Sequence, residues 1–118
     1  MERNLYESII IDDIINQYPE YKEKLKKQLL LASVKDRTLY KYGFSVDYVI
    51  NNSDAATLGQ DVNLMLETDG WKINGLEHGS GYILWIKNGL IDSLEGYSYE
   101  EPWPEEITFC EKNADIDT

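Results

Sequence analysis

The residues of this chain that could carry chemistry are a short histidine–serine segment and many carboxylates. His78-Gly79-Ser80-Gly81 places a base two residues from a hydroxyl nucleophile. A nucleophile elbow needs the pattern G-x-S-x-G on a turn from a strand into a helix. Here the glycines flank Ser80 directly, and the segment lies between two predicted strands. The pattern favours a glycine-rich strand connection, with room for a close backbone approach by a partner or a loop.

Metal binding has little support in the sequence. One histidine and one cysteine, Cys110, cannot supply the ligands of a typical zinc site. The calcium-loop pattern D-x-[DN]-x-[DN]-G does not occur, and Asp115 and Asp117 lie very near the last residue. Weak, nonspecific binding of divalent ions is the most that these carboxylates indicate, so we expect no metal site and no cofactor.

The acidic residues gather in the second part of the chain. Residues 1–43 hold eight Lys/Arg and seven Asp/Glu, whereas residues 44–118 hold three Lys/Arg and fifteen Asp/Glu. The formal net charge is −11, and a field of this sign repels nucleic acid and anionic membranes but attracts basic proteins. Solubility alone is the alternative interpretation of such a charge. We expect a basic protein partner, no nucleic acid and no membrane.

Residues 94–107 combine these carboxylates with aromatic rings. Pro102 and Pro104 bar regular strand pairing and hold Trp103 in an extended segment. Tyr and Trp give a large contact area at low entropic cost, and glutamates around them would pair with Lys or Arg of a partner. The alternative is that the rings cover the sheet edge or the core. The predicted partner-binding residues are Glu95, Tyr97, Tyr99, Glu100, Glu101, Trp103, Glu105 and Glu106.

A carboxylate pair that acts on sugars is an alternative function, because Tyr97, Tyr99 and Trp103 could stack on a sugar ring. A domain of 118 residues rarely forms a deep enough cleft, however, and no acid–base pair stands out. We therefore expect a non-catalytic protein. A small carbohydrate-binding or carboxylate-using hydrolase domain, and a structural or regulatory subunit that dimerises, remain as alternatives.

Two helices are predicted in the N-terminal part. Asn4 and Glu7 fit a capping box, and apolar residues then recur at helical spacing, which predicts a helix over 5–17. Pro19 suits the first turn of a second helix over 19–33. The lysine-rich run 22–27 predicts a solvated helix face. It also leaves open a homodimer in which this face contacts the acidic part of a second copy.

From about Leu39 the hydrophobic period changes to two, which predicts strands. Asp69-Gly70 and Asn88-Gly89 are hairpin signals. The first is expected to join strands at 62–66 and 71–76, and the second to join strands at 82–87 and 90–95. In the strand at 82–87, Tyr82, Leu84 and Ile86 would face one way and Ile83, Trp85 and Lys87 the other. A short last strand is expected at 107–110.

These elements predict an α+β fold, with two N-terminal helices packed on an antiparallel β-meander of about five strands. The chain is expected to form a single domain over 1–118, because a hydrophobic fraction of 42% is enough for one core. Within it we expect a helical part at 1–36, a sheet at 37–110 and a frayed tail at 111–118.

The chain also has the features of a cytoplasmic protein. No apolar run approaches the ~18–20 residues that cross a bilayer. Residues 1–5 lack the basic segment that opens a signal peptide before its apolar run. The single cysteine cannot form an internal disulfide, as is usual in a reducing compartment.

The C-terminal third carries a resemblance. Residues 79–99, with Leu94-Glu95-Gly96-Tyr97 at their distinctive centre, followed by Pro102-Trp103-Pro104, resemble a pattern in small bacterial immunity proteins of polymorphic and contact-dependent toxin systems. The resemblance implies a protein that neutralises a cognate toxin, often a nuclease with a basic active site, by occluding that site without turnover. It brings no catalytic residues with it.

Overall fold

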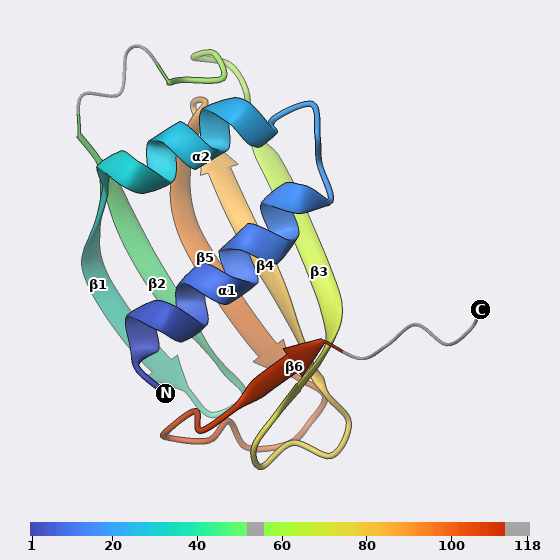
Figure 1. The fold of residues 1–118 in the computed structure, drawn as a ribbon. Helices are drawn as coiled ribbons and strands as arrows, with labels where there is room; N and C mark the ends of the chain where they lie inside the picture. Colours follow the sequence, from blue (N-terminus) through green and yellow to red (C-terminus); the bar gives the residue numbers. More distant parts are fainter. Residues whose placement is uncertain (52–55, 113–118) are drawn as a thin grey trace.

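Two helices pack on one face of an antiparallel sheet (Figure 1). The computed structural model describes residues 1–51 and 56–112, which form these two helices and six strands. The helices are α1 (Arg3–Asn16) and α2 (Lys22–Leu31). The strands are β1 (Ala32–Tyr40), β2 (Gly43–Ile50), β3 (Leu64–Ile73), β4 (Ser80–Lys87), β5 (Leu90–Ser98) and β6 (Cys110–Lys112). The predicted α+β fold class is confirmed, with six strands in the described part where about five were expected.

The strand order is β1-β2-β5-β4-β3-β6, and the neighbouring strands are antiparallel. Strands β3, β4 and β5 follow one another as a meander. Strand β2, however, lies beside β5 and not beside β3, so the sheet is not one continuous meander. The second and third strands are consecutive in sequence but are separated in the sheet by β5 and β4.

One of the two predicted hairpins is confirmed and the other is wrong. Asn88-Gly89 joins β4 to β5, with φ of 52° and 78°, as a type I′ turn requires. Asp69-Gly70 instead lies inside β3, where the register with β4 shifts between Thr68 and Trp71. Gly70, with φ of 74°, takes up this bulge. The turn between β3 and β4 falls at residues 74–79.

The core lies between the helices and the sheet. Helix α1 buries Ile10, Ile11, Ile14 and Ile15, and α2 buries Leu25. On the sheet side, alternate residues of β4 face the helices, so Tyr82, Leu84 and Ile86 are buried and Ile83 and Trp85 point away, as predicted. Each aliphatic side chain buried in this way contributes about 1.5–3 kcal/mol to folding.

The start of α1 differs from the predicted capping box. The N-cap is Glu2, with no side-chain cap hydrogen bond. Asn4 and Glu7 instead accept hydrogen bonds from the guanidinium of Arg37 on β1, and the Arg37–Glu7 ion pair measures 2.8 Å. Glu7 is 3% exposed. A buried carboxylate without a cation would cost more free energy than a helix start without a side-chain cap. The same pair raises the pKa of Arg37.

The second helix and the sheet also begin at different residues from those predicted. Pro19 lies in a turn, in which the N–H of Tyr21 donates to Tyr18 O at 3.0 Å, and α2 starts only at Lys22. Strand β1 follows α2 directly at Ala32, so the sheet begins before residue 37. The boundary between α2 and β1 is set by tertiary structure. Residues 32–34, which were expected at the end of the helix or just after it, pair with β2 instead.

The last strand lies later than predicted, at Cys110–Lys112, where it pairs with Trp71–Ile73. Glu111 and Lys112, expected in a frayed tail, therefore belong to the sheet, and the rest of that predicted tail lies outside the described residues. Among the described residues, neither helix is both long and apolar enough to cross a membrane.

The segment between β5 and β6 crosses the end of the sheet (Figure 1). It inserts Trp103 into the core. Trp103 is 7% exposed, and its ring lies 5.3 Å from that of Phe44 and 6.2 Å from that of Tyr82. The backbone N–H of Trp103 donates to Lys41 O at 2.7 Å. We call residues 99–109 the strap. Its central tryptophan is a core residue.

Replacing Trp103 should therefore cost folding stability. We expect Trp103→Ala to lower the free energy of unfolding by about 3–5 kcal/mol, because it leaves a cavity beside Phe44 and Tyr82. Denaturant unfolding monitored by circular dichroism measures this loss. The matched control is Tyr99→Ala on the same strap, where the ring is 44% exposed, and we expect a loss of at most about 1 kcal/mol. Equal stability of both variants would contradict the core role of Trp103.

Candidate protein-binding surface

The face of the sheet opposite the helices is not covered by any described helix or strand. The strand register fixes which side chains share it. One row across the sheet runs Asp36, Asp47, Ser93, Trp85, Met65, and a second runs Thr38, Ser45, Glu95, Ile83, Glu67. We call this surface the open face; its apolar and acidic members are Asp36, Asp47, Val49, Met65, Glu67, Ile83, Trp85, Glu95 and Tyr97.

The open face joins apolar side chains to carboxylates. Met65 is 48% and Val49 45% exposed, whereas Ile83, Trp85 and Tyr97 are half-buried. At the end of β4, Lys87 pairs with Asp92 across the hairpin at 3.6 Å. The four carboxylates of the face stand among these apolar groups, an arrangement suited to contact with a basic protein surface.

Two predicted partner-binding residues, Glu95 and Tyr97, lie on the open face. Trp85 Nε1 donates to Glu95 Oε1 at 3.2 Å, which fixes the carboxylate beside the indole. The Tyr97 ring lies against Gly81, where an added Cβ would come within 2.4 Å of the ring. Glycine at position 81 therefore makes room for the tyrosine. Burial, the neighbouring Tyr99 and the charges of Glu67 and Asp69 raise the pKa of Tyr97 to about 12.

The next two predicted residues lie at the start of the strap and are exposed. Tyr99 packs its ring edge-on against Tyr97, with centroids 5.7 Å apart. Glu100 follows in the left-handed region, with φ of 67°, a conformation that turns the chain away from β5. Tyr99 thus extends the aromatic surface of Tyr97 beyond the end of the sheet.

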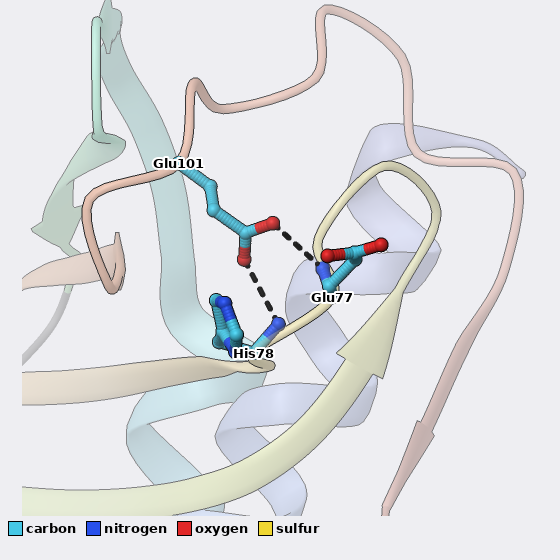
Figure 2. Close-up of side chains that lie close together, drawn as sticks. All are labelled: Glu77, His78 and Glu101. Atoms are coloured by element: carbon cyan, nitrogen blue, oxygen red, sulfur yellow. Dashed lines mark hydrogen bonds between the residues drawn. The ribbon is translucent and has the colours of Figure 1, made fainter.

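Glu101 has a structural role. Its two carboxylate oxygens accept hydrogen bonds from the backbone N–H groups of Glu77 and His78, both at 2.9 Å (Figure 2). These N–H groups hold the pKa of Glu101 below its ordinary value. The carboxylate therefore ties the strap to the turn between β3 and β4.

The remaining predicted residues do not join the open face. Trp103 is buried in the core, and Glu105 and Glu106 are exposed on the strap. Together with the first turn of α1, they border a cavity of about 530 Å³ on the helix side of the sheet. The structure thus separates the predicted set into open-face, strap and core positions.

Glu77, His78 and Glu101 could together offer ligands to a divalent ion. Their nearest ligand atoms lie within 4.8 Å of one another, and both glutamates and the histidine are at least partly exposed (Figure 2). Glu101 already satisfies two N–H groups. The arrangement is explained by the closure of the turn, so it does not change the expectation of no metal site.

The histidine–serine segment lies only in part in the connection between two strands: His78 and Gly79 belong to the turn, whereas Ser80 and Gly81 begin β4. The serine faces the core. Ser80 is fully buried, and its hydroxyl bonds Trp71 O at 3.2 Å and the Tyr82 hydroxyl at 2.8 Å. His78 is exposed on the turn. Because Ser80 is engaged in the core, it is not presented to a substrate, and the two residues do not form a nucleophile–base site.

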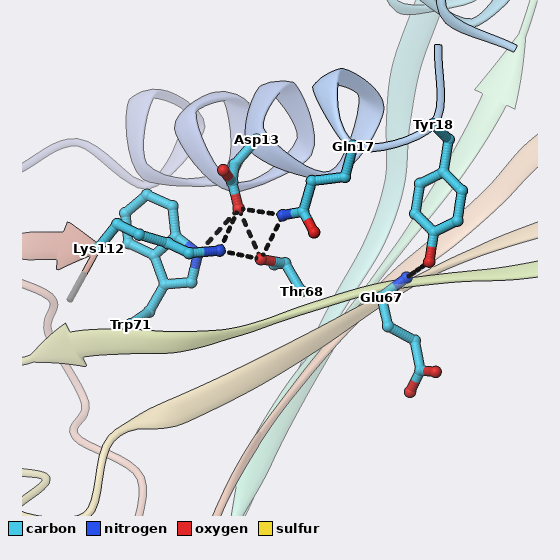
Figure 3. A network of polar contacts seen from close by, with 7 residues as sticks. All are labelled: Asp13, Gln17, Tyr18, Glu67, Thr68, Trp71 and Lys112. Atoms are coloured by element: carbon cyan, nitrogen blue, oxygen red, sulfur yellow. Dashed lines mark hydrogen bonds and ion pairs between the residues drawn. The ribbon is translucent and has the colours of Figure 1, made fainter. Parts of the chain in front are cut away.

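A polar network joins α1, β3 and β6 (Figure 3). Asp13 accepts hydrogen bonds from Thr68 at 2.6 Å, Gln17 at 3.0 Å and Trp71 at 3.3 Å, and pairs with Lys112 at 3.0 Å. Burial raises the pKa of Asp13, but these partners outweigh it and hold the pKa below the ordinary value. The sequence showed no sign of this network, since its members lie up to 99 positions apart.

No protein-family model, curated protein or solved structure matches the chain. The resemblance of residues 79–99 and 102–104 to immunity proteins therefore stays an expectation.

Asp13→Asn should make stability less dependent on pH. A carboxyl whose pKa is lower in the folded state stabilises the fold above its ordinary pKa, near 4, and loses this effect as pH falls through the folded value. At pH 7 we expect a loss of about 1 kcal/mol from the weakened hydrogen bonds. Thermal unfolding between pH 7 and pH 3 should show the two proteins converging at low pH. A constant difference across this range would contradict the assignment.

Glu101→Gln should loosen the turn between β3 and β4. The neutral amide oxygen is a weaker acceptor, and its NH₂ group cannot accept the second N–H. We expect faster amide hydrogen exchange at Glu77 and His78, with the amides of β5 unchanged. Glu100→Gln is the matched control, because Glu100 is exposed and precedes Glu101 directly. Unchanged exchange in Glu101→Gln would remove the structural role of Glu101.

Proposed function

We propose that this protein is a non-catalytic binding module that holds a basic protein on the open face of its sheet. The observation that carries the proposal is the open face, with its carboxylates set among apolar side chains and no described element covering it. Its carboxylates belong largely to the part of the chain that holds fifteen acidic and three basic residues. Charge of this sign speeds encounter with a basic partner, and buried apolar contacts slow its release.

The size of the molecule is sufficient for such an interface. The domain extends 41 × 35 × 23 Å, and one partner of a standard interface contributes about 800 Å². A sheet face is also rigid, because its backbone is held by cross-strand hydrogen bonds. A rigid surface loses little entropy on binding.

A narrower proposal follows from the resemblance of residues 79–104. On this view the protein is an immunity protein of a bacterial toxin system, and it neutralises a cognate, nuclease-like toxin in the cytoplasm by occluding a basic active site. The acidic open face supports this form of the proposal, because carboxylates can take the place of substrate phosphates at Lys and Arg side chains.

Capture of the partner tests the proposal. We expect the tagged protein to retain a basic protein from its native cells at about 50 mM salt and to release most of it at about 500 mM salt, because screening weakens the attraction. The retained protein is then purified, and its association rate is measured with Asp36→Asn/Asp47→Asn. We expect a rate about tenfold lower at low salt.

The matched control is Glu20→Gln/Glu23→Gln, which removes the same charge at the start of α2, on the helix side of the sheet. We expect its association rate to stay within about twofold of the unmodified protein. The proposal fails if no basic protein is retained at either salt concentration, or if both double variants slow association equally.

A further inference from the structure

Ile83 has four neighbours on the open face. We call the group the cross; it consists of Ile83, Glu67, Trp85, Glu95 and Tyr97. Along β4, Trp85 stands two residues on, and Gly81 stands two residues back, with the Tyr97 ring against it. Across the sheet, Ile83 pairs with Glu95 on β5 and with Glu67 on β3. Adjacent strands are about 4.8 Å apart. Two aromatic rings and two carboxylates therefore surround one half-buried isoleucine.

Contacts within the protein already fix the side chains of Glu95 and Tyr97 without a partner. The hydrogen bond from Trp85 Nε1 fixes Glu95 at 3.2 Å. The Tyr97 ring fills the gap left by the missing side chain of Gly81, and Tyr99 supports it edge-on at 5.7 Å. Preorganised groups of this kind bind with a smaller entropic loss than flexible surface side chains.

The cross has unbalanced negative charge. In the described part of the chain, ion pairs join Arg37 to Glu7, Lys87 to Asp92 and Lys112 to Asp13. None of these uses Glu67 or Glu95. A hollow of about 240 Å³ at β3, which reaches the helix side of the sheet, is lined by Glu67, Asp69 and Tyr97 together with Gln17 and Thr68. The site therefore offers carboxylates to a cation that this chain does not itself supply.

We propose that the cross around Ile83 binds an arginine side chain of the basic partner. The inference rests on the proposed function and names the residue chemistry that the open face recognises. The guanidinium is planar, stacks on aromatic faces and pairs with carboxylates through a fork of donors. Its aliphatic stem would lie on Ile83 and its charge between Glu67 and Glu95. Lysine has the charge but neither the plane nor the fork, so it fits less well.

Hexa-arginine and hexa-lysine peptides of equal charge test the inference by calorimetry at about 50 mM salt. We expect hexa-arginine to bind about fivefold more tightly than hexa-lysine, since a stacked, desolvated guanidinium gains on the order of 1 kcal/mol. Glu67→Gln/Glu95→Gln should weaken hexa-arginine binding about tenfold. Hexa-arginine should also change the fluorescence of the protein, and Trp85→Phe should abolish that change, because Trp71 and Trp103 are buried.

The matched control is Glu20→Gln/Glu23→Gln, which removes two exposed charges away from the open face. We expect it to weaken hexa-arginine binding by no more than about threefold. Equal loss in the two double variants, or equal affinity for the two peptides, would overturn the arginine site and leave only a general attraction between opposite charges. No saturable binding of hexa-arginine would overturn it as well. The proposed function is decided separately, by whether a basic protein is captured from the native cells.

Discussion

Both helices cover the same face of this sheet, and the rest of the structure depends on that arrangement. Helices α1 and α2 bury their apolar side chains against alternate residues of the central strands. The other alternate residues have no described element to pack on, so they must be compatible with water or with a partner. This explains why buried Tyr82, Leu84 and Ile86 alternate with half-buried Ile83 and Trp85. The open face is thus a direct consequence of where the helices dock.

The strap has the composition of an interface segment, but two of its residues stabilise the fold. Trp103 contributes to the core, and Glu101 closes the turn between β3 and β4. At the end of the strap, β6 adds to the edge of β3, and Lys112 reaches Asp13 on α1 (Figure 3). The strap therefore holds both the sheet end and the first helix. Such multiple anchoring fixes the position of Tyr97 on the open face and of Tyr99 beside it.

The carboxylates on the two sides of the sheet differ in whether they are paired. On the helix side, the buried carboxylate Glu7 is neutralised by Arg37, and the carboxylate of Asp13 is satisfied by four neighbours, as the cost of desolvation demands. On the open face, Glu67 and Glu95 lie at the surface of the sheet without an ion pair in the described part of the chain. This difference separates carboxylates that are paired within the fold from carboxylates that have no ion pair in the described residues.

The sequence by itself determined the features that depend on neighbours along the chain. It predicted both helices, the alternation in β4, the Asn88-Gly89 turn, the α+β class and the acidic second part, because each depends on local spacing, turn chemistry or composition. It also placed Glu95 and Tyr97 among the candidate contact residues. Only the tertiary structure decided that β2 pairs with β5, that Asp69-Gly70 forms a bulge and that Trp103 enters the core. Strand order, register and burial are set by contacts between residues far apart in sequence, so no local pattern specifies them. The same contacts bring Glu67, Ile83 and Glu95 side by side from three strands.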